Sequence, residues 1–107
     1  MGTRPAVAGD VIRDLGAFAV VVGVSGGEAA VVPVIAAQAG VQVRGDVRLG
    51  SLPGIRNAVA RCGAAQVVRL RDWLVVASGV DFWALRRAIA RVDESERVER
   101  AHGRRTG

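Results

Sequence analysis

The chain has 107 residues, half of them apolar, and fourteen glycines, which fits one small folded domain and excludes an extended disordered protein. The single Cys62 excludes an intrachain disulfide, and with the single His102 it excludes a metal cluster of Cys and His ligands. All fifteen basic residues are arginine, and the net charge is +5. This charge indicates either an anionic binding partner, such as nucleic acid, or arginines that only keep a valine-rich domain in solution.

The N-terminal residues predict a short arm followed by a strand. Residues 1–8 form the arm, and no hydrophobic segment with a secretory cleavage site follows them. Together with the lone cysteine, which is typical of a reducing compartment, this predicts a cytoplasmic protein. The stretch GDVIRDL (Gly9–Leu15) alternates apolar and polar residues well enough to form a first strand.

The stretch AFAVVVGVSGGEAAVVPVIAAQAG (residues 17–40) is either a membrane span or a pair of buried strands. A membrane helix needs about 20 apolar residues, and this segment nearly qualifies. Its middle is interrupted by Ser-Gly-Gly-Glu (Ser25–Glu28), where a carboxylate costs about 2.5–3.5 kcal/mol in a bilayer. Because valine favours strands and Ser-Gly-Gly-Glu suits a hairpin turn, we predict strands over Ala17–Val24 and Ala29–Ala36 in a domain without membrane contact.

The following residues predict further short strands separated by turns. Pro33 cannot donate a hydrogen bond to a neighbouring strand, so its strand is an edge or contains a bulge at this proline. We predict a strand over Val41–Leu49, a turn over Gly50–Gly54, and one bent strand or two short strands over residues 57–70. RDW followed by LVVAS (residues 71–78) adds one more short strand.

The stretch SGVDFWALRRAIARV (Ser78–Val92) predicts an amphipathic helix. Ser78 with Asp81 three residues later approximates a capping box at its start. Its apolar residues recur at helical spacing, namely Phe82, Leu85, Ile89 and Val92. Residues 93–107 are charged and poor in apolar side chains, so they form a helical extension or a disordered tail.

Closely spaced strands followed by one helix predict a mainly β domain over residues 9–92, a small barrel or bent sheet covered by the helix. Several strings, in this order, resemble the MazF/PemK family of toxin–antitoxin ribonucleases. These strings are AGDVI, AFAVVVGV, AAVVPVIAAQ, DVRLGSLPGIRNAVARCGAAQVVRLRDWL and SGVDFWALRRAIARV. The resemblance spans roughly residues 8–92 and implies an SH3-like barrel with a terminal helix.

The resemblance also implies a function. Members of the family cleave single-stranded RNA without a metal or other cofactor, usually as homodimers, and an antitoxin with a disordered tail holds them inactive. It therefore implies a cytoplasmic bacterial endoribonuclease whose partners are single-stranded RNA and an antitoxin. Fold resemblance alone does not establish activity. The alternatives are a catalytically inactive member that binds RNA or an antitoxin-like peptide, and a small membrane-associated protein.

The sequence departs from the family at the usual catalytic positions. Where the family has an Arg-Pro pair, this chain has Ala17 and Phe18, and where the family has hydroxyl residues after Val-Pro-Val, it has Ile35 and Ala36. Metal-free RNA cleavage needs a base for the 2′-hydroxyl proton and cations for the charge that builds on the phosphorane. Apolar side chains supply neither, so the sequence leaves the catalytic residues unassigned.

Arginines in the second half of the chain offer replacement cations. We predict RNA contacts from Arg44, Arg48, Arg56 and Arg69, and from Gln66, which matches a glutamine of the family. The alternative is that these arginines are solvated and scattered over both sides of a barrel.

Four further residues with reactive or polar groups are interpreted as structural. Asp10 and Asp14 are predicted to be solvated loop carboxylates rather than a catalytic pair. Trp73 lies near Arg69 in the sequence and could stack on a base, but packing in the core is the preferred interpretation. Cys62 lies in an apolar strand and is interpreted as an inert buried thiol.

Overall fold

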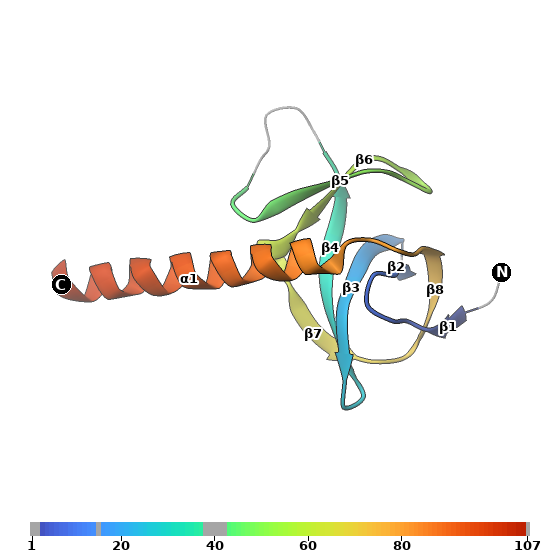
Figure 1. The fold of residues 1–107 in the computed structure, drawn as a ribbon, viewed down its shortest axis with the longest axis horizontal. Helices are drawn as coiled ribbons and strands as arrows, with labels where there is room; N and C mark the ends of the chain where they lie inside the picture. The colour runs from blue at the N-terminus through green and yellow to red at the C-terminus, as the bar shows by residue number, and fades with distance from the viewer. Residues whose placement is uncertain (1–2, 15, 38–42, 107) are drawn as a thin grey trace.

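The chain folds into one antiparallel β-sheet followed by a long helix (Figure 1). The computed structural model describes residues 3–14, 16–37 and 43–106. Eight strands take part in the sheet in the order β1-β8-β2-β3-β4-β6-β5, and β7 pairs with β4 off this path. The elements are β1 (Thr3–Pro5), β2 (Val11–Asp14), β3 (Ala17–Ser25), β4 (Glu28–Ala36), β5 (Asp46–Leu52), β6 (Ile55–Arg61), η1 (Cys62–Ala64), β7 (Gln66–Arg69), β8 (Asp72–Ala77) and α1 (Phe82–Thr106). The predicted mainly β fold with a C-terminal helix is confirmed.

The segment that resembles a membrane span forms the β3–β4 hairpin. The two strands pair along nearly their whole length, and Ser25 lies opposite Glu28 at the turn. Gly26 and Gly27 close this turn with φ angles of 58° and 77°, which glycine adopts without steric strain. The two predicted strands are thus confirmed. Among the described residues, no helix is both long enough and apolar enough to cross a membrane.

β3 and β4 are apolar on both faces because both faces are covered. One face belongs to the helix-side core, whose buried members are Val11, Val20, Val22, Val32, Val34, Ile55, Ala58, Ala60, Cys62, Leu85 and Ala88. The other face belongs to the Trp73 core, whose buried members are Ala6, Ile12, Val21, Ala29, Val31 and Trp73. Successive side chains of a strand point to opposite faces, so a continuous apolar run is needed to fill two cores.

Pro33 lies in an internal strand, so the predicted edge is wrong, and the irregularity in the β3–β4 pairing lies between Val21 and Gly23 rather than at the proline. β4 pairs with β3 on one side and with two shorter strands on the other. β7 pairs with residues 28–31 of β4 and β6 pairs with residues 34–36, so Pro33 lies at the point where β4 changes partner. A residue without a backbone N–H is tolerated there because a hydrogen bond to either strand is not required.

The strands after the hairpin differ from prediction in their boundaries. The predicted strand Val41–Leu49 lies partly outside the described residues, and β5 begins only at Asp46, after a turn. The predicted turn over Gly50–Gly54 is shorter than expected, because β5 continues to Leu52 and pairs with β6. Residues 57–70 do form two strands, with the 3-10 turn η1 between them, and β8 forms as predicted.

Helix α1 begins at Phe82, and Asp81 caps it rather than Ser78. The Asp81 Oδ1 atom accepts the backbone N–H of Ala84 at 3.2 Å, which satisfies one of the free donors of the first turn. Ser78 is too far upstream, because Gly79 turns the chain with a φ of 80° before the helix starts.

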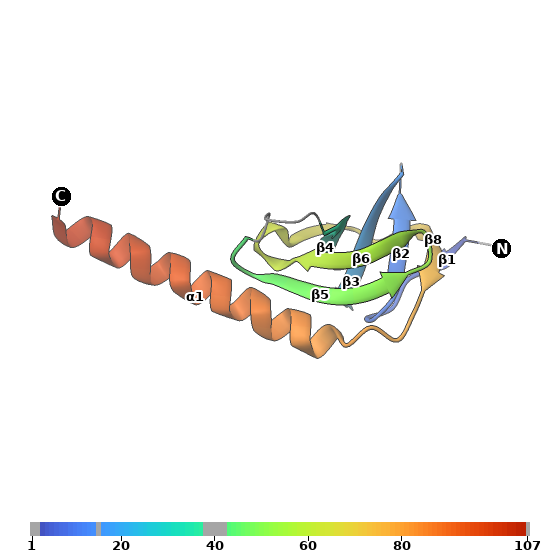
Figure 2. The same ribbon diagram turned by 90° about the horizontal axis from the view of Figure 1, so that it is seen from above.

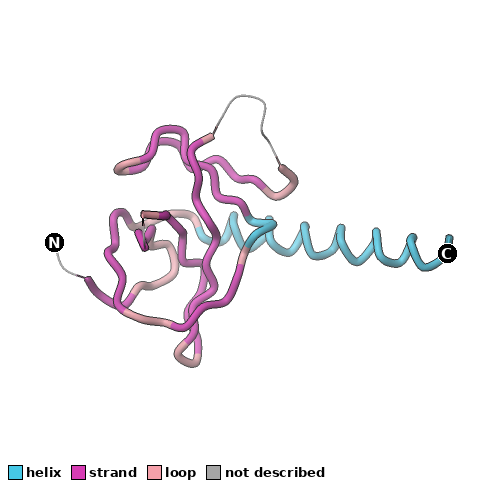
Figure 3. Tube along the Cα trace, turned by 180° about the vertical axis from the view of Figure 1, so that it is seen from behind, coloured by secondary structure: helices cyan, strands magenta, loops and turns pink. Residues whose placement is uncertain are grey.

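The first part of α1 packs along the sheet, and its second part extends beyond it (Figure 2). The tube trace shows the strands curving together and the helix leaving them (Figure 3).

The N-terminal segment is tied to the sheet through Asp10. Residues 3–5, which the sequence assigns to an arm, form β1 and pair with β8. Asp10 is 1% exposed, so its interpretation as a solvated loop carboxylate is wrong. Its Oδ2 atom accepts the N–H of Val7 at 3.0 Å and lies 3.1 Å from the Arg4 guanidinium. A buried carboxylate needs such partners, and here they hold the arm against the sheet.

Gly45 allows the turn before β5 to lie against α1. Its φ is +92°, and a Cβ added there would lie 2.6 Å from a methyl carbon of Val92 and 3.2 Å from the Gly63 nitrogen. We expect Gly45→Ala to lower the free energy of unfolding by about 3 kcal/mol, because backbone strain and overpacking act together. Gly50→Ala is the control, since Gly50 also has a positive φ of +76° but open space around it. That variant should lose only about 1 kcal/mol by urea denaturation, and equal losses would contradict the packing argument.

Asp46 and Arg61 link the start of β5 to the end of β6. The Arg61 guanidinium donates to both Asp46 oxygens at 3.2 and 3.4 Å, and the Val43 N–H donates to Oδ2 at 3.0 Å. Burial alone would raise the pKa of Asp46, but the hydrogen bonds from Arg61 and Val43 outweigh it, so the pKa lies below its ordinary value of 3.8.

This depressed pKa makes the Asp46 contribution to stability depend on pH. The folded state holds the carboxylate charged more strongly than the unfolded chain does, so the contribution is full above the ordinary pKa of 3.8 and is lost as pH falls through the lower folded value. We expect the difference in unfolding free energy between wild type and Asp46→Asn to be constant above about pH 5 and to shrink below about pH 4. Asp93→Asn, on the exposed side of α1, serves as the control. A difference that does not change with pH would contradict the assignment.

Candidate nucleic-acid interface

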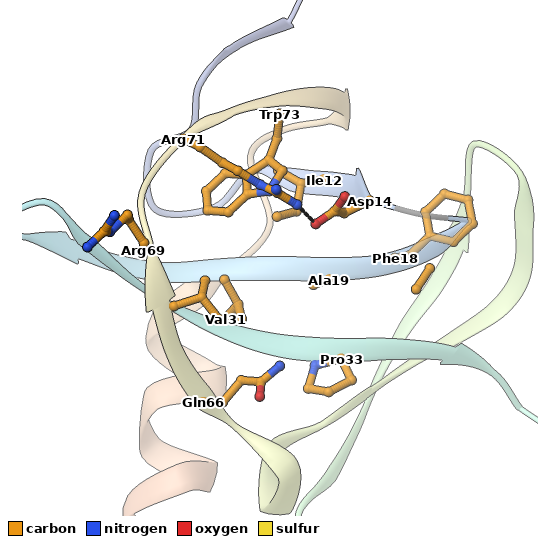
Figure 4. Close-up of a pocket in the computed structure, with 12 residues that line it drawn as sticks. Ile12, Asp14, Phe18, Ala19, Val31, Pro33, Gln66, Arg69, Arg71 and Trp73 are labelled. Atoms are coloured by element: carbon orange, nitrogen blue, oxygen red, sulfur yellow. Dashed lines mark hydrogen bonds and ion pairs between the residues drawn. The ribbon is translucent and has the colours of Figure 1, made fainter.

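A cavity of about 490 Å³ opens on the side of the sheet that carries the Trp73 core (Figure 4). This volume lies within the range of about 300–1,000 Å³ that is typical of ligand sites. The cavity is lined by Ile12, Asp14, Ala17, Phe18, Ala19, Val31, Pro33, Gln66, Val68, Arg69, Arg71 and Trp73. These residues come from β2, β3, β4, β7, β8 and the link between β7 and β8, so the curvature of the sheet creates the site.

The floor of the cavity is apolar and belongs to a packed core. Ile12, Val31 and Trp73 are buried members of the Trp73 core, and Ala19 and Val68 pack against them. A floor of this kind is held in place by the surrounding side chains. It offers an apolar surface to a ring.

The wall of the cavity carries polar groups from three separate segments. Asp14 ends β2, Gln66 and Arg69 begin and end β7, and Arg71 lies in the link that leads to β8. β7 is placed by its pairing with β4, in which Gln66 lies opposite Val31. Gln66, Arg69 and Arg71 are all exposed at the mouth of the cavity, where an anionic ligand can reach them.

Arg71 and Asp14 form an ion pair across the cavity, between the Arg71 Nη2 atom and the Asp14 Oδ2 atom. Their side chains are 58% and 41% exposed. Surface pairs of this kind contribute little to stability because water screens them. A phosphate, which binds an arginine with two parallel hydrogen bonds, can therefore replace the carboxylate as the partner of Arg71.

Trp73 packs in the core, as predicted, but it also lines the cavity. The residue is 4% exposed, and its indole Nε1 atom has no hydrogen-bond partner among the described residues. A buried donor without an acceptor costs about 1–3 kcal/mol relative to a satisfied one. This N–H is therefore a group that a ligand acceptor in the cavity would stabilise.

The structure brings together only part of the predicted RNA-binding set. Gln66 and Arg69 line the cavity, whereas Arg44, Arg48 and Arg56 lie outside it. Arg48 and Arg56 are on the β5–β6 hairpin at the other end of the sheet, and the Arg44 guanidinium lies 2.9 Å from Glu99 of α1. The scattering of these arginines follows from the strand order, because β6 and β7 occupy different parts of β4.

Sequence reasoning missed the pairing of Arg71 with Asp14. The two residues are 57 positions apart, and each looks like an ordinary charge at the end of a strand. The sequence offers one signal for Arg71: it follows Arg69 by two residues, and Arg69 is a predicted RNA contact. The sequence predicts Asp14 to be a solvated loop carboxylate, but the residue lies at the end of β2 and in the cavity wall.

The positions that the predicted resemblance aligns with catalytic residues of the MazF/PemK family lie in two places. Ala17 and Phe18 line the cavity, and the Arg13 guanidinium lies 5.7 Å from the centre of the Phe18 ring. Ile35 and Ala36 are exposed at the end of β4, outside the cavity. Cations therefore reach the cavity from β7 and the β7–β8 link instead of from the start of β3.

Cys62 and the acidic residues do not add another reactive centre in the part of the chain that the structure describes. Cys62 is 2% exposed, and burial, together with the nearby Asp46 carboxylate, raises the pKa of its thiol. A thiol that stays protonated is a poor nucleophile, which agrees with its interpretation as a buried inert group. Among the described residues, no three His, Cys, Asp or Glu side chains lie close enough together to hold a metal ion.

Comparison with known proteins gives no relative for this chain. No family model, no curated protein and no solved structure matches it. The resemblance to the MazF/PemK family therefore stays a prediction, and the geometry of the cavity is the basis for a functional proposal.

Proposed function

We propose that this chain is a MazF/PemK-like toxin of a toxin–antitoxin pair, an endoribonuclease that cleaves single-stranded RNA without a metal. One observation carries the proposal: Arg69, Arg71, Gln66 and Asp14 all line a single cavity with an apolar floor. Arginines bind phosphate, the amide can bind a base edge, and the floor can take a base that has left its stack. The SH3-like barrel implied by the resemblance and the cytoplasmic location belong to the same proposal.

The cavity contains the groups that the first half of the reaction needs. An RNA phosphate draws the Arg71 guanidinium away from Asp14, which frees the carboxylate to accept the proton of the adjacent 2′-hydroxyl. The 2′-oxygen then bonds to phosphorus and the bond from phosphorus to the 5′-oxygen breaks. Arg69 and Arg71 stabilise the charge on the phosphorane, and the departing 5′-oxygen takes a proton from water. The products are a 2′,3′-cyclic phosphate and a 5′-hydroxyl.

A second candidate function is binding without cleavage, to RNA or to an antitoxin-like peptide. Two observations favour it. Asp14 is already neutralised by Arg71, and the positions where the family has catalytic groups carry Ala17, Ile35 and Ala36. Under this alternative the arginines and the apolar floor still hold an anionic, partly apolar partner, but the scissile bond is not attacked.

The antitoxin and the homodimer are further parts of the proposal. The second part of α1 extends beyond the sheet, and Val98 on it is 51% exposed. A short helical segment in water is only marginally stable by itself, so a partner that packs against it would stabilise it. Light scattering of the purified chain, alone and with the product of a neighbouring gene, tests both partners.

The direct test is incubation of the purified protein with single-stranded RNA in the presence of a chelator. We expect discrete fragments with cyclic phosphate ends, and no cleavage of an RNA with 2′-O-methyl groups, because the nucleophile is then blocked. An Asp14→Asn protein purified in parallel controls for contaminating ribonucleases. Salt-sensitive RNA binding without fragments would support the second candidate, and neither binding nor cleavage would overturn both.

A further inference from the structure

The buried Trp73 indole N–H points to a ligand feature that the proposed function does not specify. We propose that the cavity takes one unstacked nucleobase and selects uracil, with the indole N–H donating to a carbonyl oxygen of the base. The inference rests on the proposed RNA site, but it does not require that the RNA be cleaved. It follows from the chemistry of the groups that surround the cavity.

The polar groups of the cavity are mostly hydrogen-bond donors. Trp73, Arg69 and Arg71 can only donate, and Gln66 can both donate and accept. Asp14 can only accept, and in the structure its Oδ2 atom is taken by Arg71. When Arg71 turns to the phosphate, the proposed function gives Asp14 the 2′-hydroxyl as its partner, so Asp14 is not counted as an acceptor for the base. A ligand that fits this set presents more acceptors than donors on its edge.

Among the four RNA bases, uracil meets this requirement best. It presents two carbonyl oxygens and one N–H, so the donors of the cavity face its oxygens and the Gln66 amide oxygen accepts its N–H. Cytosine places an amino group where uracil has a carbonyl, which would set donor against donor. Adenine has no carbonyl, and guanine brings one carbonyl with an amino group and a ring N–H that need acceptors of their own.

The apolar floor suits the face of such a ring. Val31 and Trp73 are buried members of the Trp73 core, and Ala19 and Pro33 line the cavity beside them. Unstacked bases in RNA complexes gain affinity from contact with surfaces of this kind. The cavity volume of about 490 Å³ leaves room for the sugar and for a phosphate near Arg69 and Arg71.

A base can reach the buried indole N–H only if side chains at the cavity move, and Arg71 lines the same cavity. In Figure 4 its side chain crosses the view of the Trp73 ring on its way to Asp14, and the Nε1 atom is buried. The Arg71–Asp14 pair is exposed and therefore readily exchanged. The inference requires that the indole edge becomes accessible to the base when the guanidinium turns to the phosphate.

The first test varies only the ligand. Fluorescein-labelled pentanucleotides carry one 2′-deoxynucleotide with a single test base between abasic sites, so that cleavage cannot occur, and binding is measured by anisotropy. Uracil is expected to bind about tenfold more tightly than cytosine or adenine, and N3-methyluracil to lose about tenfold because its N–H is blocked. Uracil, cytosine and adenine within threefold of one another would overturn the inference, even if the protein cleaves RNA.

The second test varies the protein, with one tryptophan serving as control for the other. Trp73→Phe keeps an aromatic ring but removes the N–H, so the preference for uracil over cytosine should fall below about threefold. Trp83→Phe should keep it, because Trp83 is 57% exposed on α1 and outside the cavity. In the Trp83→Phe protein, where Trp73 is the only tryptophan, uracil should also quench the fluorescence. A Trp73→Phe protein that is folded by circular dichroism and retains the preference would overturn the inference. If it does not fold, the ligand series decides.

Discussion

Replacing Arg71 with alanine is expected to lower kcat/KM for cleavage of single-stranded RNA by about 100-fold, the usual effect of removing one group that stabilises a developing anion. Arg71 lines the cavity and pairs with Asp14, so the variant loses a cation at the proposed position of the scissile phosphate. Arg69→Ala should have a similar effect, because Arg69 also lines the cavity. The measurement is the initial rate on a fluorogenic RNA in the presence of a chelator.

Arg48→Ala and Arg56→Ala are the matched controls. They remove the same charge from exposed positions on the β5–β6 hairpin, so the net charge is identical in all four variants. The controls should change kcat/KM by less than about threefold, since rim charges alter mainly the rate of encounter. Similar losses in all four would mean that the total positive charge, and not the cavity, determines activity. The melting temperatures should differ little, because all four side chains are exposed.

The hairpin shows how much of the fold the sequence specifies. Its strands were predictable because a glycine pair interrupts two valine-rich runs, and turn chemistry is local. The two-sided burial of β3 and β4 was not predictable from the same runs, since it depends on β7, β8 and α1 packing around them. Pro33 shows the same limit, because it is acceptable in an internal strand only where two other strands divide the length of β4 between them.

The start of α1 was misplaced for a related reason. Ser78 and Asp81 are both good capping residues, and sequence spacing does not decide between them. The choice is made by Gly9 and Val80, whose backbone groups pair at 3.0 Å and hold residues 78–80 against the N-terminal segment as irregular chain. Only Asp81 is then free to cap, and it does so through the N–H of Ala84.

The candidate site was predictable only where it follows from one strand. Gln66 and Arg69 lie at the two ends of β7, and their closeness in the sequence marked them. Asp14 joins them through the pairing of β2 with β3, and of β3 with β4, which no local pattern encodes. The unpaired Trp73 N–H could not be predicted from the sequence, because it depends on the absence of a hydrogen-bond acceptor among the described neighbours.

The largest expected loss of stability is at Leu85, where Leu85→Ala should lower the free energy of unfolding by about 3–5 kcal/mol. The side chain is fully buried in the helix-side core, between α1 and the sheet, and its removal leaves a cavity that rigid strands cannot fill. A small domain has a total stability of about 5–15 kcal/mol, so this change should be plain in urea denaturation and in the melting temperature.

Val98→Ala tests whether this effect comes from docking or from helix propensity. Val98 is on the same helix but is 51% exposed, beyond the sheet, so its truncation should change stability by less than about 0.5 kcal/mol. Similar losses at both positions would mean that α1 does not pack on the sheet in solution.

The Trp73 core lies on the opposite face of β3 and β4, so the folded fraction of Leu85→Ala should keep wild-type RNA binding. The two faces of one hairpin would then be separable, with one supporting the helix and the other the candidate RNA site.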